Sequence, residues 1–346
     1  MWKIGPCSRI PIPVQHQGGL TISRLRRLIE DARALRLGAI DCNTTTVFRI
    51  ANSDGDGLPG FFVDRYGHWA VSIECREKDD TIRTRVYGAL MDAWDLKGIY
   101  EKGPARAGYH PGQAGEDEPV MGEAAPAEFV VRENGMALVA RLREGAKPGV
   151  YPDQRENRLY LQPLMKGAKV LNLFSYTGAF SVWAALCGAG ETVSVDLSKR
   201  VLEWSRLNFE ANNIGLAAHR HVKADAFDYL GLARRKGFRF DLVILDPPTF
   251  STNRRGLFRA QRDWPRLIAA ACKVLERGGR LAISSNTHHI SKREMLALIG
   301  AGIDGKRRHV VKPETVLGLP ADFPVSPKAP EAHTLQFIVT RPISAG

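Results

Sequence analysis

The sequence is poor in cysteine, and this sets the first limits on what the chain does. Its five cysteines are scattered over 346 residues, with no C-x-x-C pair and no other spacing typical of metal ligands: Cys7, Cys42, Cys75, Cys187 and Cys272. A disulfide framework or a zinc site would need cysteines at regular, close spacing. We therefore expect neither of these, and no metal cofactor.

Long apolar runs are also missing. No stretch approaches the roughly 18 consecutive apolar residues that span a bilayer. The start of the chain is broken by Pro6, Pro11 and Pro13 and lacks the apolar core of a signal peptide. A hydrophobic content of 44% still suffices for buried cores. These features predict a soluble protein of the cytoplasm without membrane contact, long enough for two or three domains.

Acidic residues are outnumbered by basic ones. The 37 Asp and Glu stand against 49 Lys and Arg, which gives a formal net charge of +12. Short basic runs lie at 234–236, 254–255 and 306–308, and five arginines recur along one predicted helix: Arg24, Arg26, Arg27, Arg33 and Arg36. Any one cluster could be an ordinary solvated face. Together they favour a polyanionic partner, namely nucleic acid.

The first part of the chain predicts an arm followed by a small domain. Residues 1–39 are expected to form the arm and a basic helix that stops at Gly38. Residues 40–148 predict a small α+β domain on the RNA or substrate side. Its strands are expected at 46–50, 60–64, 69–75 and 98–100, its helix at 80–94, and a hairpin at 128–142 that turns at E-N-G. Residues 103–127 are rich in glycine and predict a flexible excursion.

Residues 149–346 predict an α/β domain of Rossmann-like type. Strands are expected near 169–174, 191–196, 219–224, 240–246 and 279–285, and helices near 178–187, 199–212, 226–236, 262–276 and 291–301. This alternation is typical of a doubly wound parallel sheet. Two last strands, at 308–312 and 333–340, would complete a seven-stranded sheet. Five parallel strands with such a pair are the arrangement of class I S-adenosylmethionine-dependent methyltransferases.

The first strand of this domain runs into a turn that predicts a nucleoside site. The stretch V-L-N-L-F-S-Y-T-G ends at Gly178, which lets the backbone approach a ligand at the carboxyl end of the strand. Asp196 ends the next strand, where a carboxylate can accept both ribose hydroxyls of a nucleoside cofactor. It could equally cap a helix, since Asp196-Leu197-Ser198 is a good helix start. The absence of G-x-G-x-x-G disfavours NAD.

Two further strands end in acidic residues. Asp225-Ala226 could bond an adenine amino group or simply cap the next helix. The sharper signal is D-P-P-T-F, residues 246–250, because two prolines remove amide donors and leave carbonyl and carboxylate acceptors at the crevice. Phe250 could stack on a base there. An ordinary proline turn is the alternative.

These motifs resemble those of large-subunit ribosomal RNA methyltransferases. L-N-L-F-S-Y-T-G, V-D-L-S, D-P-P-T-F-S and Y-P-D-Q-R-E-N-R are similar both to the cytosine-C5 enzymes and to the guanine-N7 half of a bifunctional enzyme. The stretch D-G-D-G-L-P-G-F-F-V-D-R-Y-G resembles the cytosine branch, although that branch's usual amino-terminal RNA-binding domain is not recognisable. The resemblance implies S-adenosylmethionine as cofactor, S-adenosylhomocysteine as its product, and large-subunit (23S) ribosomal RNA as substrate.

The resemblance also implies which residues hold the cofactor. Tyr151, Asp153, Gln154 and Arg155 would enclose its methionine end; for residues 153–158 a capped helix start with local ion pairs is the alternative. The full expected cofactor-binding set is Tyr151, Gln154, Arg155, Asn172, Phe174, Ser175, Gly178, Asp196, Leu197, Asp225, Ala226 and Asp246.

The fifth strand departs from the cytosine branch. It ends in I-S-S-N-T-H-H-I, so Asn286 stands where S-C-S would place a nucleophilic cysteine, and the guanine-N7 branch is similar here with S-N-N. Cytosine C5 needs a thiolate to add to C6 first, whereas guanine N7 has an exposed lone pair and needs only alignment. We expect Asp246 and Asn286 to hold the base and Phe250 to stack on it as the catalytic residues. The paired His288 and His289 could contact phosphate or a base edge, or have an ordinary role.

The sequence therefore predicts an enzyme that methylates guanine N7 of large-subunit ribosomal RNA without a cysteine nucleophile. Formation of 5-methylcytosine is the alternative in the same class. From other classes, the chain could be a non-catalytic RNA-binding ribosome-assembly factor, or a small-molecule methyltransferase, which the missing RNA-binding domain would suit.

Overall fold

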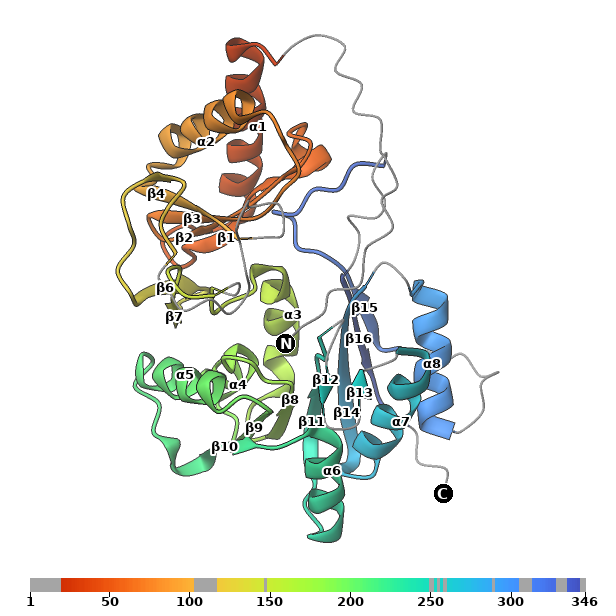
Figure 1. The fold of residues 1–346 in the computed structure, drawn as a ribbon. Coiled ribbons are helices and arrows are strands. Elements are labelled where there is room, and N and C mark those ends of the chain that lie inside the picture. The colour runs from red at the N-terminus through yellow and green to blue at the C-terminus, as the bar shows by residue number, and fades with distance from the viewer. Residues whose placement is uncertain are drawn as a thin grey trace.

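Two sheets organise the chain, and each carries its own helices (Figure 1). The computed structural model describes residues 20–102, 117–145, 148–248, 252–253, 256–257, 260–287, 290–304, 313–327 and 335–342. The N-terminal unit is drawn in red to yellow and the C-terminal unit in green to blue. A blue segment near the end of the chain runs back to the N-terminal sheet (Figure 1). None of the described helices combines the length and apolarity that crossing a bilayer requires.

The N-terminal unit is a five-stranded sheet, as far as it is described, with two helices packed on it. Its elements are α1 Ile22–Ala39, β1 Val47–Asn52, β2 Phe61–Tyr66, β3 Trp69–Cys75, α2 Asp80–Trp94, β4 Gly98–Glu101 and β5 Met121–Gly122. The strands follow the order β1-β2-β3-β4-β5, and only β3 and β4, which α2 connects, run parallel. The predicted strands and both helices are confirmed. The stretch predicted as an excursion contains β5, and residues 103–116 lie outside the described part.

One arginine of the predicted basic helix turns inward. Arg36 is fully buried, and its guanidinium donates to both oxygens of Asp56, at 2.5 and 2.7 Å, and to the carbonyl of Arg49 at 3.0 Å. A buried guanidinium needs such a paired and hydrogen-bonded environment. The expectation that all five arginines face solvent or a polyanion is therefore wrong for Arg36. The other four are exposed: Arg24, Arg26, Arg27 and Arg33.

The predicted hairpin is confirmed. Strands β6 Phe129–Glu133 and β7 Met136–Ala140 are antiparallel and turn at Asn134 and Gly135. Both turn residues have positive φ, 49° and 83°, which a two-residue turn matching the strand twist requires.

Helix α5, Lys199–Glu210, and the turn after it bond the outer edge of β7 through side chains. Trp204 donates from Nε1 to the carbonyl of Val139 at 3.0 Å, and Asn208 accepts from its amide at 2.8 Å. Asn212 bonds both the amide and the carbonyl of Ala137, at 2.9 and 2.6 Å. These side chains take the place of a neighbouring strand, so they blunt an exposed edge and fix the hairpin to the C-terminal unit.

The C-terminal unit is the predicted doubly wound sheet. Its other elements are α3 Arg155–Leu161, β8 Lys169–Leu173, α4 Ala179–Leu186, β9 Glu191–Asp196, β10 His219–Lys223, α6 Ala226–Arg235, β11 Phe240–Leu245, β12 Thr252–Asn253, β13 Gly256–Leu257, α7 Ala260–Cys272, β14 Leu275–Asn286, α8 Lys292–Asp304, β15 Thr315–Leu317 and β16 Leu335–Thr340. The order of its seven described strands is β10-β9-β8-β11-β14-β16-β15, with β16 antiparallel to both neighbours. The outer neighbour of β16 is β15, Thr315–Leu317. The strand predicted at 308–312 lies outside the described residues.

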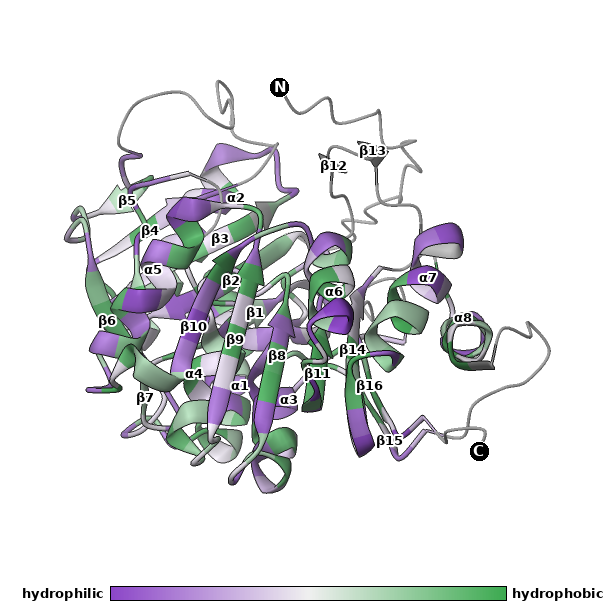
Figure 2. Ribbon diagram, turned by 90° about the horizontal axis from the view of Figure 1, so that it is seen from below, coloured by the Kyte–Doolittle hydropathy of each residue, from purple (hydrophilic) through white to green (hydrophobic). Residues whose placement is uncertain are grey.

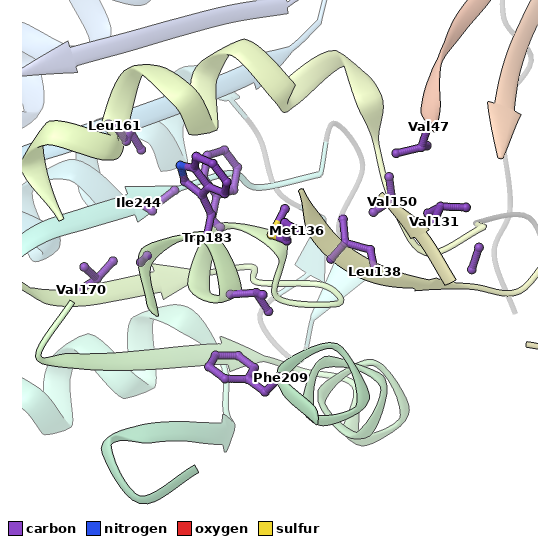
Figure 3. Close-up of a cluster of buried hydrophobic side chains, with 14 of the residues drawn as sticks. Val47, Val131, Met136, Leu138, Val150, Leu161, Val170, Trp183, Phe209 and Ile244 are labelled. Carbon is purple, nitrogen blue, oxygen red and sulfur yellow. The ribbon is translucent and has the colours of Figure 1, made fainter. Parts of the chain in front are cut away.

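The order of the parallel strands reverses between β8 and β11, which is where such sheets bind their ligands. Alternate residues of these two strands enter different cores: Val170 packs with α3, α4 and α5 on one face, and Leu171 with α6, α7 and α8 on the other. Figure 3 shows the first core, with Trp183 between α3 and the sheet. In Figure 2 the central strands are coloured hydrophobic and the edge strand β10 largely hydrophilic. The central strands are thus buried on both faces, as the sequence predicted.

A segment before β16 clasps the N-terminal unit. The buried Asp322 accepts from Arg155 Nη2 at 2.5 Å and from the amide of Arg49 at 3.0 Å, and its own carbonyl accepts from Arg36 at 2.9 Å. The guanidinium of Arg49 also lies over the ring of Phe323, 4.4 Å from its centre. Helix α3, the tail and the N-terminal sheet are therefore held together by one buried ionic network.

Candidate active site

The turn after β8 has a strained backbone. Phe174 and Tyr176 adopt φ values of 60° and 48°, and Gly178 one of 77°. Side chains disfavour this region, and where it recurs it often marks a functional site. The Ser175 amide donates to the carbonyl of Val195 in β9 at 3.0 Å, which fixes the turn. The hydroxyl oxygen of Ser175 is shielded from solvent and has no hydrogen-bond partner.

Asp196 ties this turn to the end of β9. One carboxylate oxygen accepts from the Tyr176 amide and the other from the Ser198 amide, both at 3.0 Å. The neighbouring Leu197 is 42% exposed, and the helix cap itself is Ser198, whose hydroxyl accepts from Val201 at 3.5 Å. Asp196 therefore sits at the carboxyl edge of the sheet and shapes the turn, while the capping that the sequence left open falls to Ser198.

Gly178 is required for close packing as well as for its φ. A Cβ on this residue would lie 2.0 Å from the Ser205 hydroxyl on α5, whereas a Cβ on Gly188, at the other end of α4, would meet only Lys166 Cγ, at 3.9 Å. Both glycines have a left-handed φ, 77° and 83°. Gly188→Ala should therefore lower the free energy of unfolding by about 1 kcal/mol through backbone strain alone, and Gly178→Ala by about 3 kcal/mol. Urea unfolding measures both, and equal effects would contradict the packing argument.

Asn172 lies within β8 and not at its end. It is buried, and its Nδ2 donates to the Ser181 hydroxyl at 3.0 Å; Ser194 also bonds that hydroxyl, at 2.8 Å. This polar network joins β8, β9 and α4 directly below the turn. The network therefore supports the turn. The expected role of Asn172 in cofactor binding stays a prediction.

Asp225 caps α6. Its Oδ1 accepts from the amides of Phe227 and Asp228, at 2.9 and 3.4 Å, and Ala226 is buried at the first position of the helix. The capping that the sequence allowed is thus present. The carboxyl group still stands at the same edge of the sheet as Asp196, one strand further out.

Asp246 and Asn286 come from neighbouring strands. Leu245 of β11 lies opposite Ile283 of β14, so the half-buried Asp246 follows one strand and the exposed Asn286 ends the other at the same edge. The structure therefore brings these two predicted catalytic residues to the same edge of the sheet, on neighbouring strands. The third one, Phe250, and the paired histidines His288 and His289 lie outside the described residues.

The backbone of residues 149–151 is held in place next to the turn after β8. Three successive backbone carbonyls each accept a hydrogen bond from a side chain: Gly149 from Thr177 at 2.5 Å, Val150 from Tyr66 at 2.9 Å and Tyr151 from Arg158 at 3.0 Å. The rings of Tyr151 and Tyr176 also lie 5.5 Å apart. The segment thus closes over the strained turn.

Gln154 and Arg155 continue this frame. Gln154 donates from Nε2 to the Ser284 hydroxyl in β14 at 2.8 Å and accepts from Asn157 at 2.7 Å. Arg155 bonds both carboxylate oxygens of Asp322, at 2.5 and 3.2 Å. Both side chains are buried in these contacts. The structure therefore gives them a place in the framework, and their expected contact with a cofactor stays a prediction.

Asp153 is the exception in this segment. It is half-buried, and its Oδ1 is shielded from solvent without a hydrogen-bond partner. Desolvation raises the pKa of its carboxyl to about 7, and the nearby charges of Asp246 and Asp64 act in the same direction. Since Tyr151 is fixed at the β8 turn and Gln154 at β14, Asp153 lies between them, by Asp246 at the end of β11.

Sequence reasoning missed several residues of this frame. Asp322 stands in a proline-rich loop with no local signal, and Ser284 looks like an ordinary strand residue. Their partners are 167 and 130 positions away in the chain, so only the fold shows them. Within the described residues, no group of three or more His, Cys, Asp or Glu side chains is arranged to hold a metal ion.

Comparison with known proteins shows which family this chain resembles. The family described as S-adenosylmethionine-dependent methyltransferase matches residues 106–335. A Bacillus subtilis protein, provisionally named ribosomal RNA large subunit methyltransferase YwbD, is 33% identical over 320 residues, which cover 91% of this chain and 79% of that protein. The ribosomal RNA large subunit methyltransferase I of Salmonella arizonae is 35% identical over 68% of this chain, but the alignment spans only 58% of that protein.

Solved structures agree with this. SMU.776, provisionally described as a methyltransferase and complexed with SAH, superposes with a TM-score of 0.84 at 30% identity, covering 93% of this chain and 82% of that one. A SAM-dependent methyltransferase from Agrobacterium tumefaciens superposes with a TM-score of 0.62 at 21% identity, covering 87% and 91% of the two chains, a likeness of fold alone. The predicted α/β methyltransferase fold is thereby confirmed.

Proposed function

Because the chain belongs to the S-adenosylmethionine-dependent methyltransferases, we propose that it transfers the cofactor's methyl group to a base of large-subunit ribosomal RNA. The relatives named as ribosomal RNA large subunit methyltransferases support this substrate, as does the formal net charge of +12. The observation that carries the proposal is the carboxyl edge of the sheet: the strained turn follows β8 at the point where the strand order reverses, and an aspartate stands at the end of each of three other strands, Asp196 at β9, Asp225 after β10 and Asp246 after β11.

The residues of the crevice fit this cofactor. S-adenosylmethionine brings an adenosine, a positively charged amino-acid end and an activated methyl group. In this proposal Asp196 would accept from the ribose hydroxyls and Asp225-Ala226 would contact the adenine. Gly178 and the shielded, unpartnered Ser175 hydroxyl belong to the strained turn that would contact the cofactor. The amino-acid end would then lie toward residues 151–155, next to Asp246 and Asn286.

Two atoms are candidates for receiving the methyl group, cytosine C5 and guanine N7. The stretch D-G-D-G-L-P-G-F-F-V-D-R-Y-G, residues 54–67, resembles the cytosine-C5 branch, and the similarity to the Bacillus protein extends over 91% of the chain. The likeness over the whole chain therefore supports cytosine C5 better than the guanine N7 that the motif at Asn286 favours.

The positions of the cysteines favour guanine N7, because cytosine C5 methylation needs a thiolate nucleophile. Cys187 follows α4 and Cys272 ends α7, whereas both helices begin on the side of the sheet where the parallel strands end, so these thiols lie about 12 and 20 Å along their helices from that side. Burial raises the pKa of both thiols, that of Cys272 to about 11. Cys42 and Cys75 lie in the N-terminal unit, and Cys7 is outside the described residues. Neither Cys187 nor Cys272 is thus placed or ionised as a nucleophile would be.

Replacing all five cysteines by alanine or serine should therefore leave the rate of methyl transfer within about threefold of the natural protein, because the four described thiols are buried or half-buried and are expected to contribute packing alone. Initial rates on large-subunit ribosomal RNA measure this, with circular dichroism to verify folding. A folded but inactive variant would instead establish cytosine C5 as the target and a thiolate as its nucleophile.

The function itself is tested by incubating the protein with methyl-labelled S-adenosylmethionine and unmodified large-subunit ribosomal RNA. Label in the RNA supports the proposal. RNA binding without label would point to an assembly factor, and cofactor turnover only with small molecules to a small-molecule methyltransferase. Affinity for the RNA should fall steeply with salt, since phosphate contacts release counterions.

A further inference from the structure

Asp153 is the one polar side chain between residues 151 and 155 that the frame leaves unsatisfied. Gln154 and Arg155 are bonded to Ser284 and Asp322, and the Tyr151 carbonyl to Arg158. By contrast, the Asp153 Oδ1 is shielded from water and accepts no hydrogen bond. A carboxylate without partners in such a place is costly, so it either holds a proton or awaits a positively charged ligand.

The two guanidinium groups near Asp153 each pair with another carboxylate. Arg49 lies close enough to influence it, but its guanidinium bonds Asp64 at 2.5 Å. Arg158 is likewise bonded to both oxygens of Glu133, each at 2.6 Å.

The other ionisable groups around Asp153 do not neutralise it either. Asp246 and Asp64 are negative and disfavour its ionised form. The phenols of Tyr151 and Tyr176, which flank the crevice, have a raised pKa because they are desolvated, and so they stay neutral. The protein thus surrounds Asp153 with groups that either repel its negative charge or are committed elsewhere.

We propose that Asp153 is the counter-charge for the positively charged end of the cofactor, and that it exchanges its proton for that charge when the cofactor binds. The inference rests on the proposed function. In the exchange, the O–H bond of the Asp153 carboxyl breaks and the proton passes to solvent, while the carboxylate pairs with the ligand cation. When the ligand leaves, the carboxyl takes a proton back.

The exchange makes cofactor binding depend on pH in a defined direction. With the Asp153 pKa at about 7 in the free protein, the carboxyl must first lose a proton at lower pH. Affinity for S-adenosylmethionine should therefore weaken about tenfold for each pH unit below 7 and level off just above it. If the paired charge is the amino group, affinity should weaken again above a pH of about 8, where that group loses its proton. A cation site built on a permanently ionised carboxylate would show no such pH dependence of affinity between pH 6 and 7.

Calorimetric titration of the natural protein in two buffers of different ionisation enthalpy counts the protons directly. At pH 6, where the amino group of the cofactor is already charged, we expect release of about one proton per S-adenosylmethionine bound. At pH 8.5 we expect no release, and net uptake of a proton if the paired charge is the amino group, because an α-amino group with a pKa of about 8 is largely uncharged there. S-adenosylhomocysteine distinguishes the source of the charge. Equal release with both ligands assigns the shared amino group, and release with S-adenosylmethionine alone assigns the sulfonium.

Variants complete the test. Asp153→Asn should abolish both the proton release and the pH dependence of affinity, whereas Glu203→Gln, at an exposed carboxylate on α5 that pairs with Lys199, should leave both unchanged. Tight binding without proton release in the natural protein would overturn the role of Asp153 while leaving the methyltransferase proposal intact. Absence of any S-adenosylmethionine binding would count against the proposed function itself.

Discussion

Asp322→Asn is expected to lower the free energy of unfolding by about 3 to 5 kcal/mol. The change removes the negative charge that Arg155 faces at 2.5 Å in a site where both side chains are at most 3% exposed. A buried guanidinium that loses its counter-charge retains the full cost of desolvation. The amide of Arg49 also loses its carboxylate acceptor. Urea unfolding followed by circular dichroism measures the loss.

The chain offers a matched control for this change. Asp80 pairs with Arg83 at the same distance, 2.5 Å, but is 82% exposed. Asp80→Asn should therefore cost less than about 1 kcal/mol, because water screens the pair and solvates both partners when it breaks. If the two substitutions had the same effect, the clasp formed by Asp322 would not hold the two units together as described.

Asp246→Asn is expected to reduce kcat/KM for methylation of ribosomal RNA by a factor of about 100 to 1,000. The substitution keeps the size of the side chain but removes the charge and one acceptor at the point where the base would be held, and such positioning groups contribute effects of this order. Initial rates at several RNA concentrations give the ratio.

The control for Asp246→Asn lies on the same strand. Asp241 is the second residue of β11, at the opposite edge of the sheet, where it is exposed and accepts from the Lys169 amide at 2.8 Å. Asp241→Asn should change kcat/KM less than about twofold. A comparable loss in both variants would mean that Asp246 acts through the stability of β11 and not at the crevice.

Much of the fold could be predicted because it is written in local patterns. Helix α2 was expected at 80–94 and is found there, since Asp79 caps it and apolar residues recur at helical spacing. The hairpin at Asn134-Gly135 follows from its turn residues. The positions of Asp246 and Asn286 at one edge of the sheet follow from the sequence, because parallel strands end at the same edge.

The ionic frame could not be predicted in the same way. Arg36 looked like one more basic residue on a helix, yet its partners are Asp56 and the carbonyl of Asp322, 286 positions away. Arg155 was linked to a cofactor by its motif, while the structure bonds it to Asp322. Charge and spacing along a sequence do not reveal which carboxylate a buried guanidinium will meet, because the pairing is decided by how the two units pack.

The most direct test of the proposed function is mass spectrometry of nucleosides from large-subunit ribosomal RNA, prepared from cells with and without this gene. The account predicts that one methylated base is lost without the gene and is restored by the natural protein but not by Asp246→Asn. Loss of 5-methylcytidine or of 7-methylguanosine would assign the target atom. An unchanged set of methylated nucleosides would contradict the proposal that this crevice methylates ribosomal RNA.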